Sequence, residues 1–352
     1  MNAPSQGTAA VAAKNARPPT LVRVTIVLAL ALMILLPFVS CIEKGQTYMH
    51  HWLSNQDAVA RAAVYCVPYM ETGCSLTAKV TLVPDTSAKS AAAVFNGALE
   101  ESMRSSLVTA NEFRISLEWQ YGSTAVIRHG GMTIPYPSTS GEITAEQLTA
   151  KTRTRRVELL DIATDLAEDG VQSVDVGLGS LVLERGEVDE VPSTLLAHRL
   201  FSDRFTDVRL IDRFTTYGGW SVEITSTPVN QPPREVIEKV TSIQLEPGIE
   251  PKLSIDTTNT YPGNELQPTI EVRGLPLGDE DTPALDHAAP ILAAIDGAQG
   301  FTDVKLCTAA GAVKGTSGYS CVYYDMHDGK VDRDSGYPRE QSREVYDAAQ
   351  RL

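Results

Sequence analysis

The chain has 352 residues, of which 43% are hydrophobic and 21% are charged, and this composition excludes disordered and collagen-like classes. At roughly 100–200 residues per domain, the length predicts two or three domains. The formal net charge is −14, and Lys14, Arg17 and Arg23 are the only charged residues before Cys41. The rest of the chain carries 44 acidic and 27 basic side chains. A surface this acidic repels phosphate, which argues against nucleic acid as a partner.

An apolar run follows the basic N-terminus. Residues 24–39 read VTIVLALALMILLPFV, without a charge, and the next charged residues are Glu43 and Lys44. Basic residues on the N-terminal flank of such a run predict that residues 1–23 are a cytoplasmic tail and that the remainder lies outside the cytoplasm.

Residues 24–41 have three interpretations. A single transmembrane anchor is one, because Leu21 and Val22 lengthen the run toward the ~20 residues that a bilayer requires. A lipoprotein-type signal is the second, because FVSC resembles a lipobox and makes Cys41 a candidate lipidation site, although Phe38 replaces the aliphatic residue preferred there. A buried helix of a cytosolic protein is the third.

Residues 42–70 are predicted to form a juxtamembrane helical stalk.

Beyond Cys41, four cysteines remain, and they form two local pairs. We predict the disulfides Cys66–Cys74 and Cys307–Cys321, which agree with an oxidising, extracytoplasmic compartment. Neither pair has the C-x-x-C spacing of a zinc or redox site.

A recurring spacing of 96 residues runs through the rest of the chain. FTDVRL at 205–210 returns as FTDVKL at 301–306, and the upstream segments 76–83, 173–183 and 268–275 place Val80, Val176 and Val272 at the same offset. Each of these segments reads as one strand with alternate positions buried. A helix, a strand hairpin and another helix follow each of them in turn.

This order predicts an α+β fold of three tandem βαββα(β) units of the ferredoxin-like, split βαβ type, at residues 71–171, 172–262 and 263–352. A chance recurrence of a short phrase is the alternative. If the units are equivalent, Phe113, Val208 and Val304 should be buried at matching places, and Arg209 and Lys305 should point to the opposite face.

Catalytic motifs are not evident, and we expect no catalytic residues, no cofactor and no zinc site. Weak calcium candidates are Asp325, Asp328, Asp332 and Asp334 in the loop DMHDGKVDRDSG, which departs from the EF-hand pattern. The basic cluster AKTRTRR at 150–156 is interpreted either as a contact for an anionic partner or as the exposed face of a helix. Trp220, in a Gly-rich turn, is either a partner anchor or a core residue.

The sequence therefore favours a binding or scaffolding protein of the bacterial cell envelope. The membrane would be one partner, through the N-terminal segment, and another envelope protein would be the second. An extracytoplasmic hydrolase with an unrecognised active site and a calcium-dependent adhesin are the alternatives.

Overall fold

The computed structural model describes nine stretches of the chain: residues 43–69, 73–104, 112–135, 150–168, 171–192, 205–260, 266–278, 281–313 and 317–352. The predicted anchor or signal at 24–41, with Cys41, lies outside these residues. Within the described part of the chain, no helix has the length and hydrophobicity needed to cross a membrane.

Most of the described strands come in pairs that are followed by a single helix. A helix over residues 43–54 comes first. The strands are β1 Val59–Tyr69, β2 Gly73–Leu82, β3 Glu112–Tyr121, β4 Ala125–Pro135, β5 Ser173–Val176, β6 Ser180–Val188, β7 Arg209–Thr216, β8 Ser221–Ser226, β9 Lys252–Asp256, β10 Thr269–Leu275, β11 Asp303–Thr308, β12 Cys321–His327 and β13 Lys330–Val331. The helices that follow the first are α2 Ala88–Arg104, α4 Ala150–Glu168, α5 Arg234–Thr241, α6 Leu285–Ile295 and α7 Arg339–Ala349.

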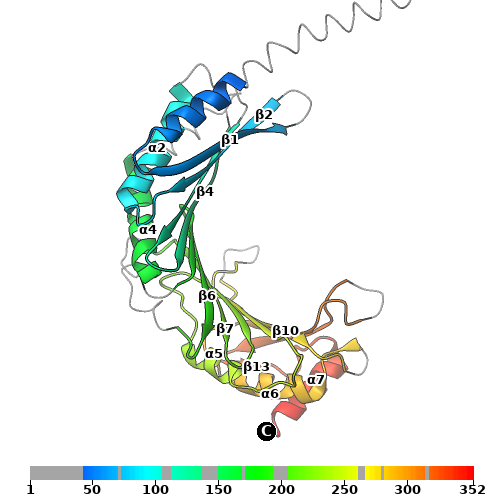
Figure 1. The fold of residues 1–352 in the computed structure, drawn as a ribbon. Helices are drawn as coiled ribbons and strands as arrows, with labels where there is room; N and C mark the ends of the chain where they lie inside the picture. Colours follow the sequence, from blue (N-terminus) through cyan, green and yellow to red (C-terminus); the bar gives the residue numbers. More distant parts are fainter. Residues whose placement is uncertain are drawn as a thin grey trace, which may run out of the picture.

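All thirteen strands belong to one sheet and lie side by side in chain order, from β1 to β13. Antiparallel hairpins such as β1–β2 and β3–β4 alternate with parallel neighbours such as β2–β3 and β4–β5. In Figure 1 the sheet curves into an arc, with α2, α4, α5 and α6 along its outer, convex side. We call the opposite side of the sheet the concave face.

Alternation along the strands explains why helices cover only one face. In β2, Ala78, Val80 and Leu82 are buried, whereas Lys79 and Thr81 between them are exposed. Successive side chains of a strand point to opposite faces, so β2 has one apolar face and one polar face. The apolar face requires cover, and the helices supply it.

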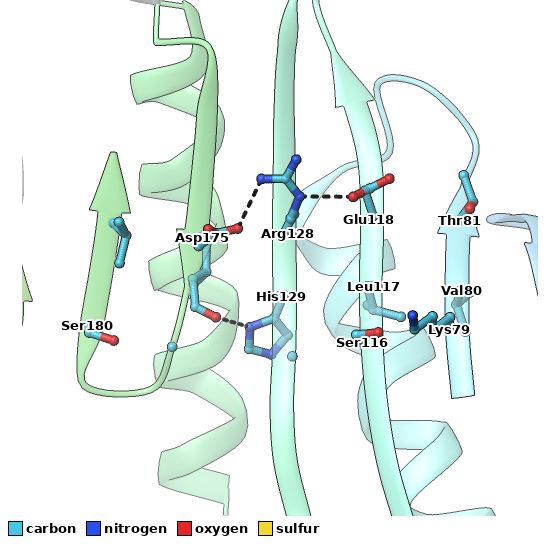
Figure 2. A pocket seen from close by; sticks show the side chains of 14 residues that line it. Lys79, Val80, Thr81, Ser116, Leu117, Glu118, Arg128, His129, Asp175 and Ser180 are labelled. Carbon is cyan, nitrogen blue, oxygen red and sulfur yellow. Dashed lines mark hydrogen bonds and ion pairs between the residues drawn. The ribbon is translucent and has the colours of Figure 1, made fainter. Parts of the chain in front are cut away.

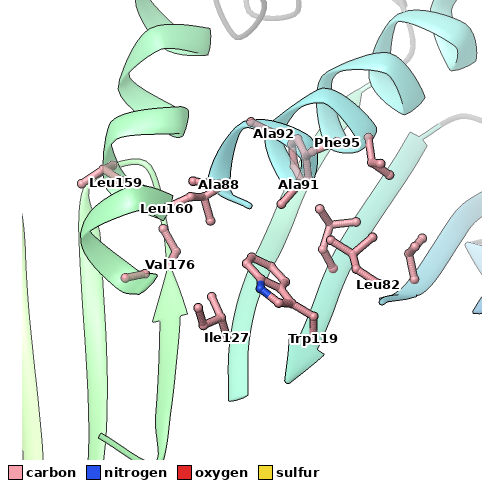
Figure 3. Close-up of a cluster of buried hydrophobic side chains, with 14 of the residues drawn as sticks. Leu82, Ala88, Ala91, Ala92, Phe95, Trp119, Ile127, Leu159, Leu160 and Val176 are labelled. Carbon is pink, nitrogen blue, oxygen red and sulfur yellow. The ribbon is translucent and has the colours of Figure 1, made fainter. Parts of the chain in front are cut away.

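The packing of α2 shows how this cover is built. Phe95 and Leu99, one helical turn apart, are fully buried against the sheet, and Figure 3 shows Phe95 with Trp119 and Leu160 in this cluster. Met103, the next residue of the same periodicity, is 40% exposed near the end of the helix. The small residues at positions such as Ala91 let the helix approach the strands closely.

Buried residues form two hydrophobic cores along the sheet. The first reaches Leu210 in β7, and the second includes Phe214 in the same strand. Asp212 lies between them and accepts hydrogen bonds from Arg185 Nε at 2.9 and 3.1 Å. Both side chains are buried, and burial raises the pKa of Asp212. A buried ion pair therefore marks the division between the two cores.

The mixed α/β character is confirmed, but the ferredoxin-like units are not. In a split βαβ unit another strand separates the two parallel strands, whereas here each helical crossover joins parallel strands that are direct neighbours, such as β2 and β3. The recurring element is a hairpin followed by a helix, and the 96-residue spacing covers two of them. The division into units at 71–171, 172–262 and 263–352 stays a prediction.

Two segments differ from their predicted secondary structure. Residues 173–183 form the hairpin β5–β6 instead of one strand, because the Gly177 N–H donates to the Ser180 carbonyl at 2.8 Å and closes a tight turn. Val176 is thus not equivalent to Val80 and Val272. The predicted helical stalk at 42–70 is helical only as far as residue 54 and continues as β1.

The burial predicted for FTDVRL, FTDVKL and the equivalent position Phe113 is confirmed. Phe113, Val208 and Val304 are fully buried. Arg209 is exposed and Lys305 is half-buried, each next to one of the buried valines. The segments FTDVRL and FTDVKL therefore each place a valine in the core beneath the helices.

Candidate binding site on the concave face

Charged side chains from neighbouring strands pair across the concave face. Arg128 in β4 lies between Glu118 in β3 and Asp175 in β5, with N–O distances of 2.9 and 3.5 Å. The three residues are direct cross-strand neighbours, because β3–β4 is antiparallel and β4–β5 is parallel in matching register. About half of each side chain is exposed, so each pair adds at most about 1 kcal/mol of stability.

A second row of charges continues the pattern toward the C-terminal half. Arg213 in β7 contacts Glu184 in β6 at 2.8 Å and Glu223 in β8 at 3.0 Å. Glu223 also accepts from Lys252 in β9 at 3.2 Å. Opposite charges thus follow one another over four consecutive strands, and the face presents both signs to a partner.

An open hollow of about 560 Å³ lies on the concave face over β2 to β6. Figure 2 shows its floor, with Lys79 beside Ser116 and with Arg128 bridging Glu118 and Asp175. In the described part of the chain, no carboxylate pairs with Lys79, and its ammonium group lies 5.9 Å from the centre of the Tyr65 ring. Lys79 is therefore a cation available to a ligand.

Gly130 lines the hollow where β3 and β4 are offset by a bulge. It lies opposite Ser116, directly after the register shift. A Cβ atom at residue 130 would lie 2.6 Å from Ser116 Cα, closer than any real contact. Only glycine allows the two strands to approach at this point.

A buried polar cluster supports the hollow from the helix side of the sheet. His129 Nδ1 is 2.8 Å from the Val176 carbonyl, and its Nε2 is 3.1 Å from Arg156 Nε. The carbonyl can only accept and the guanidinium can only donate, so His129 is neutral with its proton on Nδ1. The His129 ring also packs against Phe95, with 4.4 Å between ring centroids.

Burial controls the charge of this cluster. It lowers the pKa of His129 to about 4, and Arg156 adds a repulsive contribution in the same direction. Burial also lowers the pKa of Arg156, to about 10, so the guanidinium stays protonated near neutral pH. Arg156 donates to Asn96 and lies 4.6 Å from the centre of the Phe95 ring. One cation next to a neutral histidine therefore joins α4, α2 and β4.

The other end of the concave face carries tyrosines and the disulfide. A second hollow of about 490 Å³ is lined by Arg273, Leu277 and Tyr319, and the Arg273 guanidinium lies 4.7 Å from the centre of the Tyr319 ring. Tyrosine and arginine are, with tryptophan, the side chains enriched at binding hot spots. The hollow contributes a second contact area on the same side of the sheet.

The predicted cysteine pairs have different outcomes. Cys307 and Cys321 are directly opposite each other on β11 and β12 and are bonded, as predicted. Cys66 is also in a disulfide, whereas the side chain of Cys74 lies outside the described residues, so that pairing stays a prediction.

The weak calcium candidates do not converge into a recognisable site. Asp334 pairs with Arg343 at 2.6 Å, and one oxygen of Asp332 accepts the Asp334 N–H. Asp325 lies on β12, and Asp328 occupies the turn that follows it. Among the residues that the structure describes, no group of three or more His, Cys, Asp or Glu side chains could hold a metal ion. Calcium binding stays a prediction for titration.

The basic cluster and Trp220 mainly serve the fold. Arg155 pairs with Asp207 at 3.0 Å, Arg153 pairs with Glu100, and Arg156 is fully buried. The interpretation of 150–156 as one exposed helical face is therefore wrong for Arg156. Trp220 is fully buried and donates to the Ile243 carbonyl at 3.0 Å, which makes it a core residue.

The sequence reasoning missed the concave face as a site. The sequence contained a pattern that could have indicated it. In β3, β4 and β5, charged residues alternate with buried ones, and these charged residues include Glu118, Arg128 and Asp175. No protein-family model matches the chain, and neither a curated protein nor a solved structure matches it.

Proposed function

We propose that this chain is a membrane-tethered protein of the bacterial cell envelope that binds or scaffolds another envelope protein through its concave face. The observation that carries the proposal is the asymmetry of the sheet. One face is covered by helices, and the other is left open with paired charges and two hollows. Repeated structural units that curve in this way give extended concave surfaces suited to binding.

Charge favours a protein partner over an anionic polymer. The rows Glu118–Arg128–Asp175 and Glu184–Arg213–Glu223–Lys252 contain four acidic and three basic groups. A strongly anionic chain would be repelled, whereas a polypeptide segment with both signs could exchange these pairs for intermolecular ones.

The extracytoplasmic location rests on two observations. Basic residues precede the apolar run 24–39, and this order keeps the N-terminus in the cytoplasm. The Cys307–Cys321 disulfide is typical of an oxidising compartment. A reporter enzyme that works only outside the cytoplasm should be active when it is fused after Leu352. Activity of a reporter that works only in the cytoplasm would exclude an extracytoplasmic C-terminus.

Site-specific cross-linking tests the binding face. A photoreactive residue at Ser116, in the hollow, should give a discrete adduct with an envelope protein in native membranes. The same residue at Ser90, exposed on α2, is the matched control and should give none. Adducts from Ser90 alone, or equally from both positions, would contradict binding through the concave face.

A further inference from the structure

The first strand of the sheet has an open edge. β1 pairs with β2 from Val59 to Tyr69, with an irregularity at Ala60 near its start, and no strand in the described ranges pairs with its other side. Alternate residues of such an edge point their N–H and C=O groups outward, ready to pair with another strand.

The sequence of β1 does not block pairing at this edge. Residues 62–67 read AAVYCV, six residues without a charge, and Val67 is 43% exposed. Natural edge strands are usually protected by lysines, inward-pointing charges or central prolines. In β1, Arg61 and Pro68 lie on either side of the uncharged stretch and leave its centre free.

The opposite edge of the sheet is closed by the chain itself. β12 pairs with the two-residue strand β13. Beyond β13, the backbones of Tyr323 and Tyr337 exchange two hydrogen bonds, of 2.8 and 3.1 Å. The Asp325 N–H also donates to Ser335 Oγ at 2.9 Å. Of the two edges formed by the described residues, that of β1 is therefore the one left for extension.

We propose that a second copy of this chain binds along β1, with the two β1 strands antiparallel and related by a two-fold axis. This inference rests on the two sheet edges and is independent of the function proposed above. Because the C-terminal edge is closed, pairing ends with two copies instead of continuing into a filament. The two sheets join into one, and both concave faces open to the same side.

The alternation of β1 restricts the register of this pairing. Ala62 and Val64 are buried under the helices, whereas Ala63 and Tyr65 belong to the concave face. Residues directly opposite each other in a sheet share a face. The two-fold axis must therefore pass through a pair formed by one residue and the same residue of the second copy. Near the centre of the uncharged stretch, this means Val64 opposite Val64 or Tyr65 opposite Tyr65.

Sedimentation equilibrium of the full chain in density-matched detergent tests the proposal. The double variant Ala63→Glu/Tyr65→Glu places four carboxylates along the paired edges in either register. Within one copy, Ala63 lies opposite Lys79, which can pair with the new carboxylate and preserve the fold. Thr77→Glu is the matched control, because Thr77 is the cross-strand neighbour of Tyr65 on β2, one strand away from the edge.

The parent chain and Thr77→Glu should sediment at twice the 38.0 kDa of one chain. The double variant should dimerise at least about tenfold more weakly, since like charges directly opposite each other destabilise strand pairs. Circular dichroism and the single variant Ala63→Glu check that the fold is intact.

Several results would overturn the proposal. A monomeric parent chain is one, and protection of β1 amides from hydrogen exchange in that monomer would show that another segment of the same chain covers the edge. A double variant that is folded and still dimeric would place the contact elsewhere. Species larger than a dimer would show that the sheet extends at more than one edge.

Discussion

Protonation of His129 should destabilise the fold in mildly acidic solution. The neutral ring donates to the Val176 carbonyl and accepts from Arg156, and it is buried against Phe95. A second ring proton would face the guanidinium of Arg156, which has no acceptor to offer. The folded protein therefore resists protonation, and the unfolded chain does not.

The size of the effect follows from the two pKa values. The pKa of His129 is about 4 in the folded state, against an ordinary value of 6.5. The stability that the neutral ring provides is present above pH 6.5 and is lost as the pH falls toward 4, because the unfolded chain binds the proton first. The loss should be about 2 kcal/mol at pH 5 and about 3 kcal/mol at pH 4.

The assay compares the free energy of unfolding of the parent protein and of His129→Gln at pH values between 7.5 and 5. Unfolding in urea is monitored by tryptophan fluorescence, to which the buried Trp119 contributes. Glutamine retains a donor and an acceptor but cannot titrate. The variant loses ring packing and should be less stable at pH 7.5. Its stability should nevertheless fall by about 2 kcal/mol less than that of the parent on going to pH 5. Equal pH dependence in the two proteins would refute the reasoning.

Substitutions at three further places test the two faces of β11, the disulfide and the buried ion pair. Val304→Ala in the core of β11 should lower the free energy of unfolding by about 2–3 kcal/mol. Lys305→Ala on the concave face should change it by less than about 0.5 kcal/mol. Similar losses for the two variants in urea unfolding would show that the two faces are misassigned. Cys307→Ser should cost about 3 kcal/mol by releasing the disulfide loop, and calorimetry should show a lower melting temperature only under non-reducing conditions. Asp212→Ala should cost about 3–5 kcal/mol by leaving Arg185 buried without its carboxylate, and the paired replacement Arg185→Met/Asp212→Leu should recover most of this loss. A double variant as unstable as the single one would argue against that explanation.

Local patterns in the sequence predicted the elements well. The order of elements predicts a helix after each of the segments 76–83 and 268–275, and α2 and α6 occur at these places. The alternation beside FTDVRL and FTDVKL also identified the buried face.

The order of strands in the sheet could not be obtained in this way. A helix between two parallel strands is compatible with direct neighbours and with a strand inserted between them, and only long-range pairing decides. Reading 173–183 as one strand hid a hairpin and changed the apparent repeat. The concave site depended on register as well, since Glu118, Arg128 and Asp175 become neighbours only when three strands are aligned.

The central claim is that the concave face binds a partner in the envelope, and a pair of identical substitutions tests it most directly. Lys79 and Lys89 are both exposed lysines, the first on the concave face and the second on α2. In native membranes, the amount of partner that co-purifies with Lys79→Glu should fall by about tenfold relative to the parent, because charge reversal removes the available cation of the hollow. Lys89→Glu should recover the partner at the parental level. Equal recovery with both variants, or a loss with Lys89→Glu alone, would contradict the account.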